Sequence, residues 1–246
     1  MMINQTLQKL TEMRMPAMEK ECRRQMELPA MTGLAFEERF GLMVEAEWLF
    51  RHNNKVKRLL GAAKLRCPSA CLEDIDFAPE RHLDKALVAR LSDMSWLVDS
   101  RNLFITGACG VGKTWIASAF GNAACRLGKR AVCYRVTRLL DDLRAARTDG
   151  TWGKFLTSLK KPDLLILDDF GLDRLDAVYC RDLLEIVEER YGSGSVIITA
   201  QLPVAEWHGV FEDATIADAT LDRLVHNAHR IELRGPSRRT AAAENH

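Results

Sequence analysis

Residues 102–114 read NLFITGACGVGKT, an apolar run that leads directly into a glycine-rich loop. The loop matches the pattern G-x-x-x-x-G-K-[ST] at every defined position, and a helical pattern follows it over residues 115–127. Between a strand and a helix, such glycines allow backbone N–H groups to wrap phosphates, and the helix N-terminus adds partial positive charge. The sequence therefore predicts a phosphate-binding loop (P-loop) made of Gly107, Ala108, Cys109, Gly110, Val111, Gly112, Lys113 and Thr114.

Two side chains of this loop carry specific expectations. We expect the Lys113 ammonium to reach the β- and γ-phosphates of ATP, and the Thr114 hydroxyl to ligate Mg²⁺. A chance glycine-rich turn is the alternative interpretation, but the full match between a strand and a helix argues against it. ATP and Mg²⁺ are therefore the predicted cofactors.

A second apolar run, LLILDD at residues 164–169, ends in two carboxylates. Acids at the carboxyl end of a parallel strand lie beside a P-loop, where Mg²⁺ needs an anionic partner. We therefore expect Asp168 to be the metal-side carboxylate, acting through a bound water, and Asp169 to orient or deprotonate the attacking water. An ordinary Asp-Asp turn after a strand is the alternative.

Strand-like and helix-like stretches alternate on both sides of these motifs. Helical patterns cover residues 115–127 and 177–191, whereas strand patterns cover residues 102–106, 131–136, 164–167, 195–200 and 230–233. Alternation at this spacing indicates a parallel sheet with helices on both faces, because parallel strands need crossover connections. The predicted fold class is α/β.

The N-terminal part has a different organisation. Up to Arg66 the apolar residues recur with helical spacing, and Pro16 and Pro29 interrupt the pattern. Residues 67–80, CPSACLEDIDFAPE, then bring prolines and clustered acids. We predict a small all-helical domain over residues 1–66, a linker over 67–80, and an α/β domain over 81–246.

One stretch of the helical domain is strongly basic. It contains no acid and carries six cations over about four helical turns, namely Arg51, Lys55, Lys57, Arg58, Lys64 and Arg66. Such a block can neutralise several DNA phosphates, with an affinity that falls steeply as salt rises. A solvated helix face is the alternative, and it is the commoner fate of a charge run.

Bulk properties add limits on the class of protein. The 246 residues carry a formal net charge of +1, and no apolar run approaches the roughly 18 residues of a membrane helix. The N-terminus, MMINQTLQKLTEMRM, has no pattern of a secretory signal or transit peptide. Seven cysteines lie scattered through apolar segments, an odd number that favours reduced thiols. We expect a cytoplasmic protein without a membrane partner.

Several segments in this order resemble the IstB family, the AAA+ helper ATPases of an insertion-sequence transposition system and close relatives of the DnaC helicase loaders. The resemblance rests on GACGVGKT, LLILDDFGL, IITAQLPVAEW, DATLDRLVHNAHRIELRG and PSRR. The N-terminal TLQKLTEMRMPAM, FEERFGLMVEAEW and ACLEDIDF are also similar to that family. The resemblance therefore covers nearly the whole chain.

This resemblance implies an AAA+ core with a short lid and further site residues. Gln201 matches the position that senses the γ-phosphate, Arg223 the arginine finger offered to a neighbouring subunit, and Arg238 a second sensor arginine. The alternatives are a strand-end amide for Gln201 and a solvated helix arginine for Arg223. Many AAA+ proteins carry glutamate where Asp169 stands, so hydrolysis is expected to be slow or stimulated by DNA or a partner.

The function implied by the resemblance is that of an ATP-dependent DNA-binding helper. Such a protein binds ATP, multimerises on target duplex DNA, remodels it, and recruits or stimulates a partner transposase. A DnaC-like replicative helicase loader is one alternative, distinguished by a preference for single-stranded DNA. A non-hydrolysing DNA scaffold with ATP as a structural ligand is another. The adenine contacts are undetermined, and residues 74–77 are the segment in which to seek them.

Overall fold

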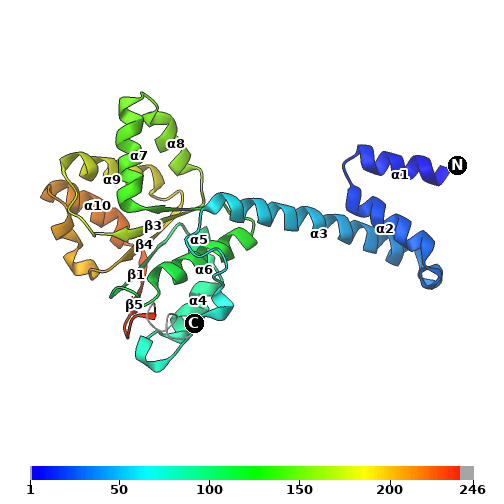
Figure 1. Cartoon of the computed structure of the whole chain (residues 1–246), viewed down its shortest axis with the longest axis horizontal. Helices are drawn as coiled ribbons and strands as arrows, with labels where there is room; N and C mark the ends of the chain where they lie inside the picture. The colour runs from blue at the N-terminus through cyan, green and yellow to red at the C-terminus, as the bar shows by residue number, and fades with distance from the viewer. Residues whose placement is uncertain (1, 239–246) are drawn as a thin grey trace. The chain divides into compact units, whose positions relative to one another are not determined.

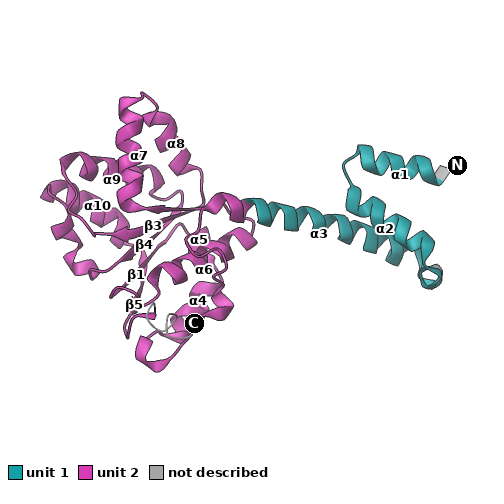
Figure 2. Cartoon of the chain, viewed as in Figure 1, with its two compact units in different colours: residues 1–58 teal, residues 59–246 magenta. Residues whose placement is uncertain are grey.

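The computed structural model describes residues 2–238, except for the side chains of Met2 and Thr32. Met1 and residues 239–246, which include the last arginine of the PSRR segment, lie outside the described residues. The chain divides into two compact units, Met1–Arg58 and Leu59–His246, shown in different colours in Figure 2. The division falls within a long helix, and we describe each unit by itself.

The first unit is helical, as predicted. It contains α1 (Met2–Glu12), α2 (Pro16–Glu27), a 3₁₀ turn η1 (Pro29–Gly33) and the greater part of α3 (Phe36–Ala63). Both prolines lie in the first turn of their helices, where the missing N–H group costs nothing. The buried Glu47 side chain of α3 accepts the N–H groups of Ala17 and Met18, at 3.0 and 3.1 Å, and so caps α2.

The second unit is built on a parallel sheet (Figure 1). Within residues 59–238 its strands are β1 (Asn102–Gly107), β2 (Ala131–Arg135), β3 (Leu164–Phe170), β4 (Ser195–Ala200) and β5 (Ala228–Leu233), in the order β2-β3-β4-β1-β5. All neighbouring pairs are parallel. The predicted α/β class is therefore confirmed, and each predicted strand corresponds to an observed one.

Helices cover both faces of this sheet. The elements are η2 (Leu72–Asp74), η3 (Pro79–Arg81), α4 (Lys85–Ser92), α5 (Ser95–Val98), α6 (Lys113–Arg126), α7 (Val136–Thr148), α8 (Trp152–Lys160), α9 (Ala177–Arg190), η4 (Val204–Val210) and α10 (Ala214–Val225). Alternate strand residues enter different cores. Leu103 and Ile105 pack with Phe120 of α6, whereas Phe104 packs with Leu183 of α9. In the described part of the chain, no helix is long and apolar enough to cross a bilayer.

Candidate nucleotide-binding site

The P-loop connects the end of β1 to the start of α6, as the motif predicts. Its glycines allow close approaches. A Cβ atom on Gly107 would lie 2.2 Å from the Leu233 carbonyl oxygen, and one on Gly110 would lie 2.1 Å from the Ser237 hydroxyl. The Lys113 ammonium donates to the carbonyl oxygens of Gly107 and Ala108, at 2.8 and 2.7 Å. The lysine side chain therefore follows the inside of the loop.

Two hydroxyl groups hold the carboxylate of Asp168 at the end of β3. Its Oδ1 atom accepts hydrogen bonds from Thr114 Oγ1 at 2.9 Å and from Thr199 Oγ1 at 2.6 Å. The side chain is only 1% exposed, and its Oδ2 atom is buried without a hydrogen bond within the described residues. Arg66 is the cation beside this atom, and its Nε lies 4.0 Å from Oδ2. Neutral hydroxyl donors therefore orient Asp168, and its second oxygen accepts no hydrogen bond from the described residues.

These oxygens fit the donor set of Mg²⁺. The ion prefers oxygen ligands and usually takes one or two protein groups together with waters and substrate phosphates. The Thr114 hydroxyl lies beside the carboxylate of Asp168, whose Oδ2 atom has no hydrogen bond within the described residues. No cluster of three or more His, Cys, Asp or Glu side chains suited to a metal occurs among residues 2–238. This arrangement can therefore hold Mg²⁺ when the phosphates of a bound nucleotide supply further oxygen ligands.

Asp169 has different surroundings from its neighbour. Its φ is +62°, and the pairing of β3 with β4 shifts register between Leu167 and Phe170. The Asp169 N–H donates to Thr199 Oγ1 at 3.0 Å, and the carboxylate pairs with Arg135 Nε at 3.1 Å. Because of this backbone turn the two consecutive carboxylates point in different directions. Asp168 lies in the interior, and Asp169 lines a cavity.

That cavity has a volume of about 330 Å³ and collects most of the predicted side chains. It is lined by Lys113, Thr114, Asp169, Gln201 and Arg238, together with Arg66 and the thiols of Cys67 and Cys109. Gln201 reaches this cavity because it directly follows β4, the strand that contains Thr199. The fold thus brings together P-loop, strand-end and C-terminal residues that are far apart in the sequence.

The C-terminal segment lies against the P-loop. The Arg238 N–H donates to the Gly110 carbonyl at 3.0 Å, and its guanidinium donates to Asp76 at 2.6 Å. Hydrogen bonding from the Ala78 N–H, assisted by Arg238, lowers the pKa of Asp76. A second cavity of about 330 Å³ opens here, lined by Asp74, Asp76, Arg81, Gly112, Trp115 and Arg238. It includes part of the segment in which the sequence directs the search for adenine contacts.

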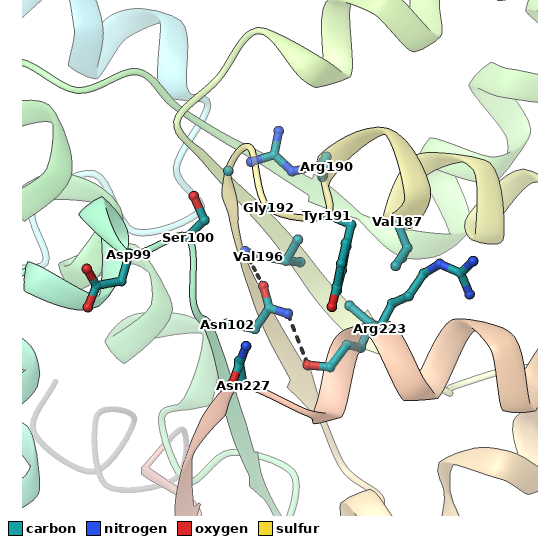
Figure 3. Close-up of a pocket in the computed structure, with 12 residues that line it drawn as sticks. Asp99, Ser100, Asn102, Val187, Arg190, Tyr191, Gly192, Val196, Arg223 and Asn227 are labelled. Carbon is teal, nitrogen blue, oxygen red and sulfur yellow. Dashed lines mark hydrogen bonds between the residues drawn. The ribbon is translucent and has the colours of Figure 1, made fainter.

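Arg223 lies away from these groups. It lies on α10 at the border of a separate cavity near the amino ends of β1, β4 and β5. In that cavity the Asn102 side chain accepts the Val196 N–H and donates to the Leu224 carbonyl (Figure 3). The Arg223 guanidinium pairs with Glu188 at 2.9 Å and donates to the Ala219 carbonyl at 2.7 Å. The P-loop follows the carboxyl end of β1, so Arg223 and the P-loop lie at opposite edges of the sheet.

The six cations of the predicted DNA-binding block do not share one environment. In the first unit, Lys55, Lys57 and Arg58 are exposed on α3, whereas Arg51 pairs with Glu47 at 2.7 Å and donates to the Arg14 carbonyl. In the second unit, Lys64 lies 5.8 Å from the centre of the Tyr134 ring, and Arg66 lines the cavity at the P-loop.

Sequence reasoning missed Thr199, Arg135 and Arg81. Thr199 has a faint signal, because it is a hydroxyl-bearing residue in a strand pattern two positions before Gln201. Arg135 is the last residue of β2, and its proximity to Asp169 becomes visible only when β2 is known to pair with β3. Arg81 is buried and donates to the Val111 carbonyl at 3.1 Å, and nothing in its local sequence indicates this contact.

Comparisons with known proteins identify ATP-binding relatives. The family model for IstB-like ATP-binding proteins matches residues 8–245. An insertion sequence ATP-binding protein of Sinorhizobium fredii is 44% identical over 239 residues, covering 97% of both chains. An insertion sequence IS1162 ATP-binding protein of Pseudomonas fluorescens is 45% identical over 203 residues, covering 82% of this chain and 88% of the relative.

Solved structures show the fold at lower identity. The DnaC helicase loader superposes with a TM-score of 0.55 and 19% identity, covering 67% of this chain and 97% of that chain. AMPPCP-bound DnaA from Aquifex aeolicus gives a TM-score of 0.58 and 21% identity, covering 74% and 56%. The second unit therefore shares the fold of the DnaC and DnaA structures, as the predicted AAA+ core implies.

Proposed function

The chain belongs to the family of IstB-like ATP-binding proteins, and on this premise we propose that it is the ATP-dependent DNA-binding helper of an insertion-sequence transposition system. It binds ATP, multimerises on target duplex DNA, remodels that DNA, and recruits or stimulates a partner transposase during DNA recombination. The observation that carries the proposal is the separation of Arg223 from its own P-loop. An arginine at the opposite edge of the sheet suits an assembly in which each ATP lies between two copies.

The carboxyl edge of the sheet provides the groups that bind the nucleotide. Lys113 and the P-loop N–H groups take the phosphates, while Thr114 and Asp168 hold Mg²⁺. When bound, Mg²⁺ neutralises negative charge on the phosphate oxygens. Gln201 and Arg238 line the same cavity, which supports roles for both near the terminal phosphate.

Hydrolysis is assigned to two side chains from different copies. Asp169 faces the cavity and orients or deprotonates the attacking water, and Arg223 of the adjoining copy stabilises charge on the transferred phosphoryl group. In a single chain Asp169 is engaged by Arg135 and Arg223 by Glu188. Both pairs must rearrange for the reaction, which supports an ATPase that is slow until DNA or a partner stimulates it.

We assign the binding of duplex DNA to the exposed cations of α3 in the first unit. Lys55, Lys57 and Arg58 are exposed, whereas Arg51 is already engaged by Glu47. Phosphate contacts of this kind are independent of base sequence and weaken as salt rises. They suit a helper that binds many target sites.

Anisotropy and sedimentation with labelled duplex and single-stranded DNA test the proposal, with and without ATP, at two salt concentrations. We expect large complexes on duplex DNA that require ATP and are lost in Lys113→Ala. The pair Lys55→Ala/Arg58→Ala should weaken duplex binding and reduce the slope of log affinity against log salt by about one to two. The pair Lys9→Ala/Lys20→Ala removes two exposed cations of the same unit and should change little.

Other results would redirect the assignment. Small complexes with a preference for single strands would replace the proposal with a helicase loader. Normal ATP binding without DNA-stimulated phosphate release would replace it with a non-hydrolysing scaffold. ATP-dependent assemblies that persist in Lys113→Ala would contradict the P-loop assignment itself.

A further inference from the structure

Arg66 brings a cation to the ATP cavity from outside the recognised motifs. It lies just after α3, which ends at Ala63, and it lines the cavity together with Lys113, Thr114 and Asp169. In sequence it reads as the last member of a DNA-binding block. In the fold it lies in the second unit, beside the groups that bind phosphate.

The backbone around Arg66 is anchored to the core of the second unit. Ala63 and Leu65 are buried, at 0% and 7% exposure. The Cys67 N–H donates to Ser118 Oγ at 3.3 Å, and Ser118 Oγ donates to the Thr114 carbonyl at 2.8 Å. A short chain of hydrogen bonds therefore joins the residue after Arg66 to the last residue of the P-loop. This anchoring limits how far the Arg66 side chain can move from the cavity.

The negative charge of Asp168, beside Arg66, explains why a cation is needed at this position. Asp168 is a buried carboxylate, and a buried ion is costly unless an opposite charge or hydrogen bonds compensate it. Its Oδ1 atom has two hydroxyl donors, but its Oδ2 atom has no hydrogen bond within the described residues. Arg66 Nε lies 4.0 Å away, within ion-pair range but beyond a hydrogen bond. The guanidinium therefore balances the charge without being bound tightly.

We propose that Arg66 binds the terminal phosphate of ATP in its own subunit, as a further nucleotide-site residue. The inference rests on the proposed function and deepens it. A guanidinium presents several N–H donors in one plane, which suits a phosphate with several acceptor oxygens. The Arg66 side chain is 46% exposed and already lines the cavity, so it can turn from Asp168 toward a phosphate. ADP lacks that phosphate, so Arg66 raises the affinity of the site for ATP over ADP.

Binding of AMPPCP and of ADP, each measured by displacement of a fluorescent ADP in the presence of Mg²⁺, tests this role. Losing a hydrogen bond between charged groups costs about 1.5–3 kcal/mol, so Arg66→Ala should weaken AMPPCP about tenfold or more and ADP about twofold at most. DNA binding without nucleotide should match the parent. Arg66→Lys, which keeps the charge but not the planar donors, should give an intermediate loss.

Arg58→Ala is the matched control. This exposed arginine lies eight positions earlier in the same basic block, and its removal should leave both nucleotide affinities unchanged while weakening DNA binding. AMPPCP affinity within about twofold of the parent in Arg66→Ala would overturn the inference, as would an equal loss for AMPPCP and ADP. Should Arg66→Ala fail to fold, Arg66→Lys decides by the same comparison. A parent that binds ATP but never assembles on DNA would overturn the proposed function alone.

Discussion

At the scale of single residues, Thr199 connects the two carboxylates of the site. One hydroxyl group donates to Asp168 Oδ1 and accepts the N–H of Asp169, and the residue is 0% exposed. A single side chain therefore sets both the orientation of the buried Asp168 and the backbone position of the half-buried Asp169. Residues of this kind support the groups that bind a metal without touching it.

Thr199→Val tests this role, because valine keeps the shape and loses both hydrogen bonds. We expect the free energy of unfolding to fall by about 1–3 kcal/mol and Mg²⁺-dependent ATP affinity to fall about tenfold. Urea unfolding and nucleotide titration measure the two effects. The control Thr220→Val removes a buried hydroxyl that donates within α10, to the Ile216 carbonyl, and should leave ATP affinity intact. Equal effects of the two variants on ATP affinity would contradict the assignment.

The thiols allow a second test at this scale. Cys109 is exposed within the P-loop, whereas Cys125, Cys133 and Cys180 are buried. Burial, together with the nearby charge of Asp168, raises the pKa of Cys133 to about 12, so this thiol stays protonated and unreactive at neutral pH.

We therefore predict that N-ethylmaleimide abolishes ATP binding in proportion to the labelling of Cys109, because the adduct occupies the phosphate loop. ATP should protect this thiol, and mass spectrometry should find the three buried cysteines unlabelled in the native protein. Cys109→Ser should bind ATP and resist the reagent. Inactivation of Cys109→Ser at the parent rate would place the sensitive thiol elsewhere, with Cys67 of the same cavity as the first alternative.

At the scale of elements, a buried arginine joins the end of α9 to its surroundings. The Arg190 guanidinium donates to the carbonyl oxygens of Leu159, Pro162 and Ser195, at 2.7, 3.1 and 2.9 Å. Burial lowers its pKa to about 10, so the group still carries its charge at neutral pH. Arg190 therefore connects the end of α8, the loop before β3 and the start of β4.

Arg190→Met should lower the free energy of unfolding by about 3 kcal/mol or more, because several buried carbonyl oxygens lose their donor. The variant should still bind ATP when folded, since these contacts lie away from the P-loop. Arg181→Met is the control, because that arginine is exposed on the same helix and donates to the Ala177 carbonyl of its own helix. Urea unfolding measures both variants. Equal stability of the two would show that the carbonyl contacts contribute nothing measurable.

At the scale of the whole molecule, the groups proposed for hydrolysis lie on two different edges of one sheet. A single copy presents the cavity proposed for ATP at one edge and Arg223 at the other, so a head-to-tail contact between copies can unite them. Such contacts are heterologous and generate rings or filaments. Activity should therefore depend on pairs of neighbouring copies.

A mixing experiment tests this dependence. Arg223→Ala and Asp169→Ala should each bind ATP and hydrolyse little. An equal mixture should regain about a quarter of the parent rate, because about a quarter of random contacts join an intact Asp169 to an intact Arg223. The control replaces the second partner with the double variant Asp169→Ala/Arg223→Ala, which supplies no arginine. A mixture that stays as inactive as this control would contradict a role for Arg223 between copies.

The sequence by itself determined the class of fold and the local part of the site. A strand, a P-loop and a helix occupy adjacent positions in the chain, so local spacing was enough to predict them, and the apolar run ending in Asp168 and Asp169 is equally local. The placement of Gln201, Arg223 and Arg238 depended on resemblance to a family. Their proposed roles stay predictions.

Only the tertiary structure decided which distant residues share a cavity. Arg66 follows the pattern of a basic helix in sequence, yet the packing of Leu65 and the bond from Cys67 to Ser118 place it beside Asp168. Arg135 meets Asp169 only because β2 pairs with β3. The physical reason is that side-chain pairing follows strand order and burial, whereas sequence patterns record only the neighbours along the chain.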